Sequence, residues 1–87
     1  MYAIVVYDVG EERVNKVKKL FRKYMVWIQN SVFEGELTSA QLMSIKHELG
    51  RIIDREYDAI HFYILKSDKY LRKETMGTPK AEVTNIL

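Results

Sequence analysis

The chain has 87 residues, of which 47% are hydrophobic and 30% are charged, and its formal net charge is +2. This length allows one domain, residues 1–87, and the absence of cysteine excludes a disulfide framework and a thiolate metal site. Because the sequence has no signal-type segment and no run of 18 apolar residues, we expect a soluble cytoplasmic protein with no membrane contact.

The first predicted element is a strand over residues 2–8, because β-branched and aromatic residues fill it and Gly10 follows it. Asp8 is its last residue. A carboxylate at the end of a buried strand is partly desolvated and rigidly held, as a metal ligand or general base must be. The same position also suits a helix cap, in which Asp8 accepts backbone N–H bonds, and spacing alone favours this role.

Residues 11–24 are predicted to form a helix, with an apolar stripe of five residues and a separate basic face. Residues 10–24 hold six basic and two acidic groups, and the connector 66–73 holds four and one. Clustered positive charge suits a surface that binds a polyanion, although such runs are often only the solvated face of a helix. The basic face of this helix includes Arg13, Lys16, Lys19 and Lys23.

Residues 26–37 have β-type sequence interrupted by the polar triplet 29–31, which predicts either one bulged strand or two shorter strands. Thr38 and Gln41 form a capping box that opens a second helix. A further strand is predicted over residues 58–66, then a short strand at 74–76 and a β-type tail at 82–87.

This order of elements predicts an α+β, ferredoxin-like (split βαβ) fold: an antiparallel sheet with two helices on one face. The other face would be left apolar, so we expect a homodimer through that face, with residues 82–87 as an extra C-terminal strand on the partner protomer. The dimer brings two copies of Asp8, which together could hold Mg²⁺.

Other site types find little support in the sequence. His47 and His61 have no acidic neighbours at ligand spacing, and there is no Gly-rich phosphate loop or nucleophile elbow. A nucleic-acid-binding sheet, as in RNA-recognition domains, could use Phe62 and Tyr63. Against that hypothesis, residues 59–65 contain no glycine, which the aromatic signature of those domains includes.

Three stretches carry a family resemblance: Tyr7-Asp8-Val9, residues 13–17, and Gln29-Asn30-Ser31-Val32-Phe33-Glu34. Over nearly its whole length the chain resembles the small universal CRISPR-associated endoribonuclease family of the adaptation stage. The resemblance implies a ferredoxin-like dimer whose C-terminal strand crosses to the partner. It also implies one Mg²⁺ per dimer at the twofold axis, held by Asp8, which would be both metal ligand and catalytic residue.

The resemblance further implies a metal-dependent endonuclease acting on single-stranded RNA or double-stranded DNA. Family members also bridge dimers of the CRISPR integrase during spacer acquisition. By the same resemblance, Tyr7 and Arg13 bind nucleic acid and Ser31 and Phe33 shape the site, while the basic helix face adds Lys16, Lys19 and Arg22. Two alternatives stay open: a non-catalytic scaffold dimer, and a toxin-type ribonuclease of similar fold.

Overall fold

The structure is a computed structural model that describes residues 1–80. The predicted C-terminal strand at 82–87 lies outside these residues and stays a prediction. The elements run in the order β1 (Tyr2–Asp8), α1 (Glu11–Arg22), β2 (Val26–Gln29), β3 (Val32–Glu36), α2 (Ser39–Ile52), β4 (Ala59–Leu65) and the 3₁₀ turn η1 (Asp68–Tyr70).

The four strands form one sheet in the order β2-β3-β1-β4, and every neighbouring pair is antiparallel. This is the strand order of the predicted ferredoxin-like fold. Residues 26–37 form two strands rather than one bulged strand, because the chain reverses at Asn30, whose φ is 41°. Asparagine tolerates this left-handed conformation better than most residues, and Trp27 Nε1 donates to the Asn30 carbonyl at 3.0 Å.

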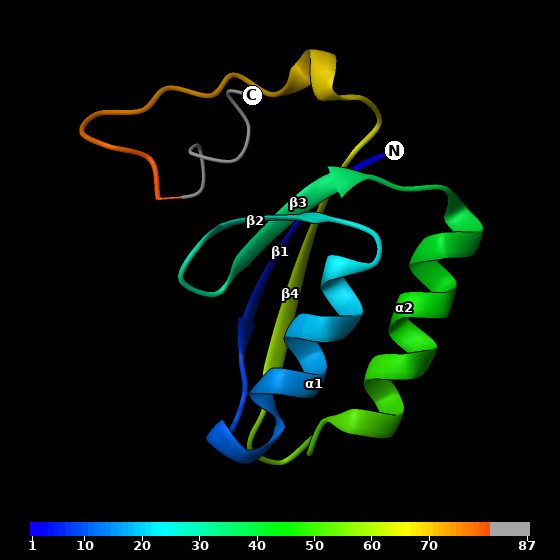
Figure 1. The fold of residues 1–87 in the computed structure, drawn as a ribbon. Helices are drawn as coiled ribbons and strands as arrows, with labels where there is room; N and C mark the ends of the chain where they lie inside the picture. The colour runs from blue at the N-terminus through cyan, green and yellow to red at the C-terminus, as the bar shows by residue number, and fades with distance from the viewer. Residues whose placement is uncertain (81–87) are drawn as a thin grey trace.

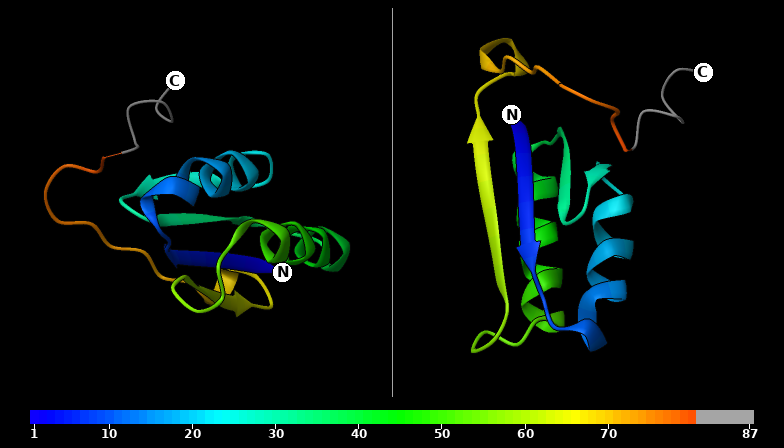
Figure 2. Two further views of the ribbon diagram at one scale, coloured as in Figure 1. Left: turned by 90° about the horizontal axis from the view of Figure 1, so that it is seen from below. Right: turned by 90° about the vertical axis from the view of Figure 1, so that its left-hand side faces the viewer.

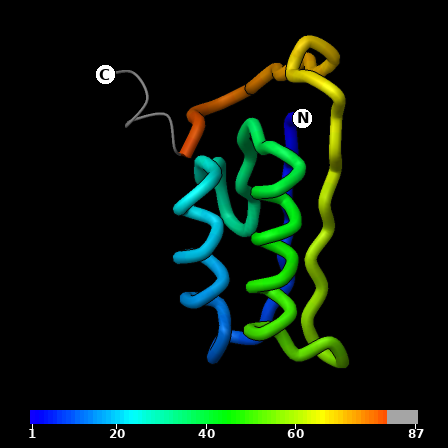
Figure 3. The backbone as a smooth tube through the Cα atoms, turned by 90° about the vertical axis from the view of Figure 1, so that its right-hand side faces the viewer, coloured from blue at the N-terminus to red at the C-terminus, as the bar shows by residue number. Residues whose placement is uncertain are grey.

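Both helices cover the same face of the sheet, as Figures 1 and 3 show from two directions. The alternate residues Ala3, Val5 and Tyr7 of β1 point into this covered face and are buried. They pack against the apolar stripes of the helices. The fully buried side chains of the core are those of Val5, Val17, Phe21, Phe33, Leu37 and Ile45.

The helix boundaries follow local hydrogen bonding. The predicted capping box opens α2: Gln41 N–H donates to Thr38 Oγ1 at 3.0 Å, and Thr38 N–H donates to Gln41 Oε1 at 2.9 Å. The first helix ends at Arg22, two residues before the predicted end at Tyr24. There the last turn tightens, since Lys23 N–H donates to the carbonyl three residues back at 3.2 Å.

The other face of the sheet carries no helix, and we call it the open face. Its residues alternate with the buried ones, and Ile4 and Val6 of β1 are half-buried there. The register places Tyr63 opposite Ile4 and His61 opposite Val6 on β4. Tyr63 is 57% exposed. The same register places Glu34 opposite Ile4 and Glu36 opposite Tyr2, so the predicted apolar patch is interrupted by acidic side chains within residues 1–80.

Residues 66–80 leave β4 and run past the end of the sheet towards the β2 side (Figure 2). Lys73 Nζ contacts the carboxylate of Glu34, which is 9% exposed and also accepts a hydrogen bond from Tyr2 Oη at 2.9 Å. The strand predicted at 74–76 is absent, because this segment pairs with no strand of the described chain. No helix within residues 1–80 is long and apolar enough to cross a membrane.

Candidate functional site

Asp8 ends β1 on the open face, where it pairs through its backbone with Ala59 of β4. The helix-cap hypothesis is wrong, because the N-cap of α1 is Gly10 and no side chain caps that helix. The expected desolvation is also wrong, since Asp8 is exposed. Within residues 1–80 its carboxylate takes part in no hydrogen bond or ion pair. A rigid strand therefore presents a carboxylate that is free to bind a ligand from outside.

The described part of the chain contains no group of three or more histidine, cysteine or acidic side chains that could hold a metal ion. Magnesium is commonly held by one or two carboxylates together with waters and phosphate oxygens. Within residues 1–80, the end of β1 offers one unoccupied carboxylate for this purpose, that of Asp8. The donor set therefore fits Mg²⁺ where two copies of the chain bring two Asp8 side chains together.

Tyr7 and Phe33 lie on the covered face, on the opposite side of the sheet from Asp8. Tyr7 is 4% exposed, and its ring centroid lies 5.9 Å from that of Phe21 and 6.1 Å from that of Phe33. Burial raises the pKa of the Tyr7 hydroxyl. The nucleic-acid contact predicted for Tyr7 does not fit this placement, because the ring is enclosed by the core. Phe33 supports the strands from behind and does not line a surface next to Asp8.

Ser31 lies closer to the candidate site. Its carbonyl accepts a hydrogen bond from the Tyr7 N–H at 3.0 Å, so the turn between β2 and β3 is tied to the end of β1. This contact holds the backbone one residue before Asp8. A role of Ser31 in shaping the site is consistent with this position, through its backbone.

Arg13 makes a paired contact with Asp58, a residue that the sequence reasoning did not single out. Arg13 Nε lies 2.6 Å from Asp58 Oδ2, and Arg13 Nη2 lies 2.9 Å from Asp58 Oδ1. The guanidinium also meets Glu12 at 2.9 Å. The hydrogen bonds from Arg13 hold the pKa of the Asp58 carboxyl well below its usual range, and the same bonds raise the pKa of the Arg13 guanidinium. The predicted nucleic-acid contact of Arg13 thus competes with two carboxylates of its own chain.

A sequence signal for Asp58 did exist. An acidic residue directly precedes the apolar stretch 59–65, and antiparallel pairing brings the start of that strand to the end of the first one. This pattern does not identify a particular contact, since acidic residues are common in the loops before strands.

Lys16, Lys19 and Arg22 are exposed on α1, as the basic helix face predicts. They belong to the helical layer, whereas Asp8 lies on the open face of the sheet. One chain therefore does not gather these cations around Asp8. They form a separate positive surface.

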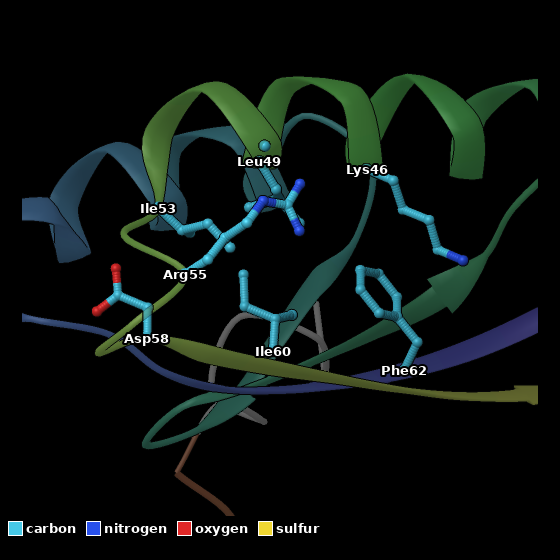
Figure 4. A pocket seen from close by; sticks show the side chains of 8 residues that line it. Lys46, Leu49, Ile53, Arg55, Asp58, Ile60 and Phe62 are labelled. Atoms are coloured by element: carbon cyan, nitrogen blue, oxygen red, sulfur yellow. The ribbon is translucent and has the colours of Figure 1, made fainter.

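A hollow of ≈ 410 Å³ lies between α2 and β4 (Figure 4). Ile60 and Phe62 form its floor, and Lys46 Nζ lies 5.3 Å from the centre of the Phe62 ring. Phe62 thus points to the covered face, while its neighbour Tyr63 points to the open face. The hypothesis that both rings stack bases on one sheet surface is wrong. Asp58 lines the hollow but its oxygens are engaged, and Asp8 is not part of it.

Comparison with known proteins gives a consistent result. The family model described as CRISPR associated protein Cas2 matches residues 1–73. A Methanosarcina acetivorans protein named CRISPR-associated endoribonuclease Cas2 is 54% identical over 87 residues, which is 100% of both chains. A Thermodesulfovibrio yellowstonii protein of the same name, numbered 3, is 50% identical over 86 residues, covering 99% of this chain and 98% of that one.

Solved structures agree with the sequence relatives. A crystal structure described as cas2 superposes with a TM-score of 0.84 at 47% identity, covering 93% of this chain and 91% of the other. The Streptococcus pyogenes Cas2 crystal structure has a TM-score of 0.77 at 42% identity and covers 88% of this chain and 100% of that one.

Proposed function

Because this chain belongs to the Cas2 family of CRISPR-associated proteins, we propose that it is a dimeric, metal-dependent endonuclease that acts in spacer acquisition. Its relatives carry the name endoribonuclease, so single-stranded RNA is the first substrate to consider and double-stranded DNA the second. The observation that supports catalysis is the exposed carboxylate of Asp8 at the end of a strand, which has no partner in the part of the chain that the structure describes.

A homodimer supplies what one chain lacks. The open face carries the apolar side chains of Ile4 and Val6 and has Asp8 at one end, so two copies that meet through this face would bury apolar surface and bring the two carboxylates together. The resulting pair would hold one Mg²⁺ per dimer. Exposed Tyr63, in the middle of the open face, would be covered in the same step.

The residues of the chain then divide the chemistry. Bound by two Asp8 carboxylates, Mg²⁺ would lower the pKa of a coordinated water and neutralise charge on the attacked phosphate. Asp8 itself is held by backbone pairing with Ala59. Lys16, Lys19 and Arg22 bind phosphates that are remote from the scissile bond, so they increase the affinity for nucleic acid without selecting a sequence.

A non-catalytic scaffold is the second candidate function, and one observation favours it. Arg13, the cation nearest in sequence to Asp8, has its guanidinium bound to Asp58 and Glu12 and so is not free to stabilise a transition state. As a scaffold, the dimer would bind double-stranded DNA and bridge two dimers of the CRISPR integrase, and spacer acquisition would depend on this bridging rather than on cleavage.

Cleavage by pure wild-type protein and by its Asp8→Ala and Asp8→Asn variants distinguishes the two candidates. Each would be assayed on single-stranded RNA and double-stranded DNA, with Mg²⁺ or with a chelator. We expect cleavage to need Mg²⁺ and to fall at least about 100-fold in both variants. Asp68→Asn, an exposed acid in η1, is the matched control and should cleave normally.

Cleavage that persists in Asp8→Asn would contradict the enzyme proposal. The Asp8→Asn dimer should still bind double-stranded DNA and the integrase. A wild-type protein that binds both but cleaves neither substrate would select the scaffold instead.

A further inference from the structure

The carboxylate of Asp58 has all of its hydrogen-bonding capacity in use. Its side chain is 0% exposed, and it accepts four N–H bonds. Oδ1 accepts from the Gly10 N–H at 2.8 Å and from Arg13 Nη2 at 2.9 Å. Oδ2 accepts from Arg13 Nε at 2.6 Å and from the Asp54 N–H at 2.8 Å. A carboxylate has about four acceptor sites, so this one has none left for a metal or a substrate.

These four bonds join three segments at the end of the sheet where Asp8 lies. Asp58 directly precedes Ala59, the backbone partner of Asp8, and Gly10 follows Asp8 by two residues. The third segment begins at Asp54, just after the end of α2. The Asp58 carboxylate therefore links the segment that follows Asp8 to the segment that precedes Ala59, next to the last backbone pair of β1 and β4.

Gly10 makes this arrangement sterically feasible. A Cβ atom at Gly10 would meet Arg13 Nη2 and Glu12 Oε1, so a side chain here would force the guanidinium away from its present position. Gly10 is also the N-cap of α1 and has no side chain with which to cap it. Asp58, which directly precedes β4, accepts a hydrogen bond from the N–H of Gly10 and fixes the direction in which the chain enters the helix.

We infer that Asp58, oriented by Arg13, is a positioning residue for Asp8: it fixes the backbone after β1 so that the Asp8 carboxylate keeps the direction needed to bind a metal. Asp58 touches neither metal nor substrate, and it acts through the backbone of residues 8–10. The inference rests on the proposed function of Asp8 as a metal ligand. It assigns to Arg13 an internal role in place of the predicted nucleic-acid contact.

Asp58→Asn tests this inference, because an asparagine has one acceptor oxygen and turns an N–H₂ group towards either Arg13 or a backbone N–H. The matched control is Glu34→Gln. Glu34 is also a buried carboxylate with a cation partner, but it lies opposite Ile4, four residues along β1 from Asp8. Both variants lose a buried charge, and only Asp58→Asn loses it next to Asp8.

Two measurements apply to each folded variant. The first is the binding of Mn²⁺, used as a paramagnetic stand-in for Mg²⁺, together with the Mg²⁺ concentration that gives half-maximal cleavage. The second is amide hydrogen exchange at Val9 and Gly10, compared with the β2–β3 hairpin. For Asp58→Asn we expect about 10- to 100-fold weaker metal binding and at least about tenfold faster exchange at Val9 and Gly10. Excess metal should restore part of the cleavage, and Glu34→Gln should change neither quantity by more than about twofold.

An Asp58→Asn protein with unchanged metal binding and unchanged exchange would overturn the inference, and so would equal effects in Glu34→Gln, which would mean general destabilisation. If the wild type neither binds Mn²⁺ nor cleaves, the proposed function fails, and the exchange rates at Val9 and Gly10 still decide whether Asp58 fixes this backbone. If Asp58→Asn does not fold, Arg13→Lys replaces it. Lysine keeps the charge but loses the paired contact, so a smaller shift in the same direction is expected, and no shift in metal binding or exchange would refute the inference.

Discussion

Asp8 and Asp58 lie at the same end of the sheet, because Asp8 pairs through its backbone with Ala59 and Asp58 directly precedes Ala59. The environments of their two carboxylates nevertheless differ. Asp58 is buried and accepts four N–H bonds from its own chain. Asp8 is exposed on the open face, and within residues 1–80 no group of the chain occupies its carboxylate. A buried carboxylate with every acceptor satisfied stabilises the fold, whereas a free one on a rigid strand is available for a ligand. Asp58 therefore has a structural role, and Asp8 is the candidate for binding a metal.

The largest difference between the two acids should be in stability. Asp58→Ala leaves Arg13 and two backbone N–H groups without their acceptor in a buried place, and we expect the melting temperature to fall by roughly 10 °C or more. Asp8→Ala should change it by no more than about 2 °C, because the Asp8 carboxylate has no hydrogen-bond or ion-pair partner among the described residues 1–80. Thermal unfolding of both variants, followed by circular dichroism, measures this. Equal effects would remove the distinction between a structural and a functional acid.

The second prediction concerns the two faces of the sheet. Tyr63→Asp places a charge in the middle of the open face and should weaken the dimer by at least about tenfold, since that charge would be buried on association. Met43→Asp is the control, because Met43 is 71% exposed on α2, in the helical layer. Sedimentation velocity over a concentration series gives the dissociation constants. A wild-type protein that stays monomeric at low micromolar concentration would contradict the assignment of the open face to dimerisation.

A smaller effect should separate the basic face of α1 from the rest of the charged surface. Replacing Lys16, Lys19 and Arg22 together by alanine should reduce the slope of log affinity for double-stranded DNA against log salt by roughly 2 to 3. The control removes the same number of charges from α2 and the loop after it, at Lys46, Arg51 and Arg55. Titrations at several salt concentrations provide both slopes. If the triple variant in α1 shows the same slope as the wild type, the basic face of α1 is only a solvated helix surface.

The smallest effect should be in the pH dependence of stability. Because Arg13 holds the pKa of Asp58 below that of a free aspartate, the stabilisation is fully present above about pH 4 and is lost as the pH falls through the lower value of the folded state. The stability advantage of the wild type over Asp58→Asn should therefore be constant from pH 7 to pH 5 and shrink below pH 4. Urea unfolding at a series of pH values measures it. An advantage that grows on acidification would contradict the ion pair.

The sequence predicted the fold well because its patterns are local and strong. The capping box of Thr38 and Gln41, the apolar stretch 59–65 and the helical spacing of α1 each identify an element without knowledge of the rest. The reversal at Asn30 could not be decided, since a bulge and a turn share the same polar residues and differ only in which strand lies alongside.

The site was predicted less completely, because its geometry depends on contacts between distant residues. Asp8 was found from its position after a strand, but its exposure follows from strand alternation relative to Tyr7, which faces the core. The pairing of Arg13 with Asp58 joins residues 45 apart in the chain, and no local pattern announces it. The burial of Tyr7 is likewise not predictable from local sequence, because its partners Phe21 and Phe33 come from two other elements.

In the proposed dimer two copies of Asp8 meet, and their distance can be tested directly by chemical crosslinking because the chain contains no cysteine. Asp8→Cys, treated with a short bis-maleimide linker, should form a covalent dimer quickly and nearly completely, and Mn²⁺ binding should be lost. Asp68→Cys, an exposed position in η1, is the reference for random collision. A dimer in which Asp8→Cys links no faster than Asp68→Cys would contradict a shared metal site, since the two carboxylates would then lie too far apart to bind one ion.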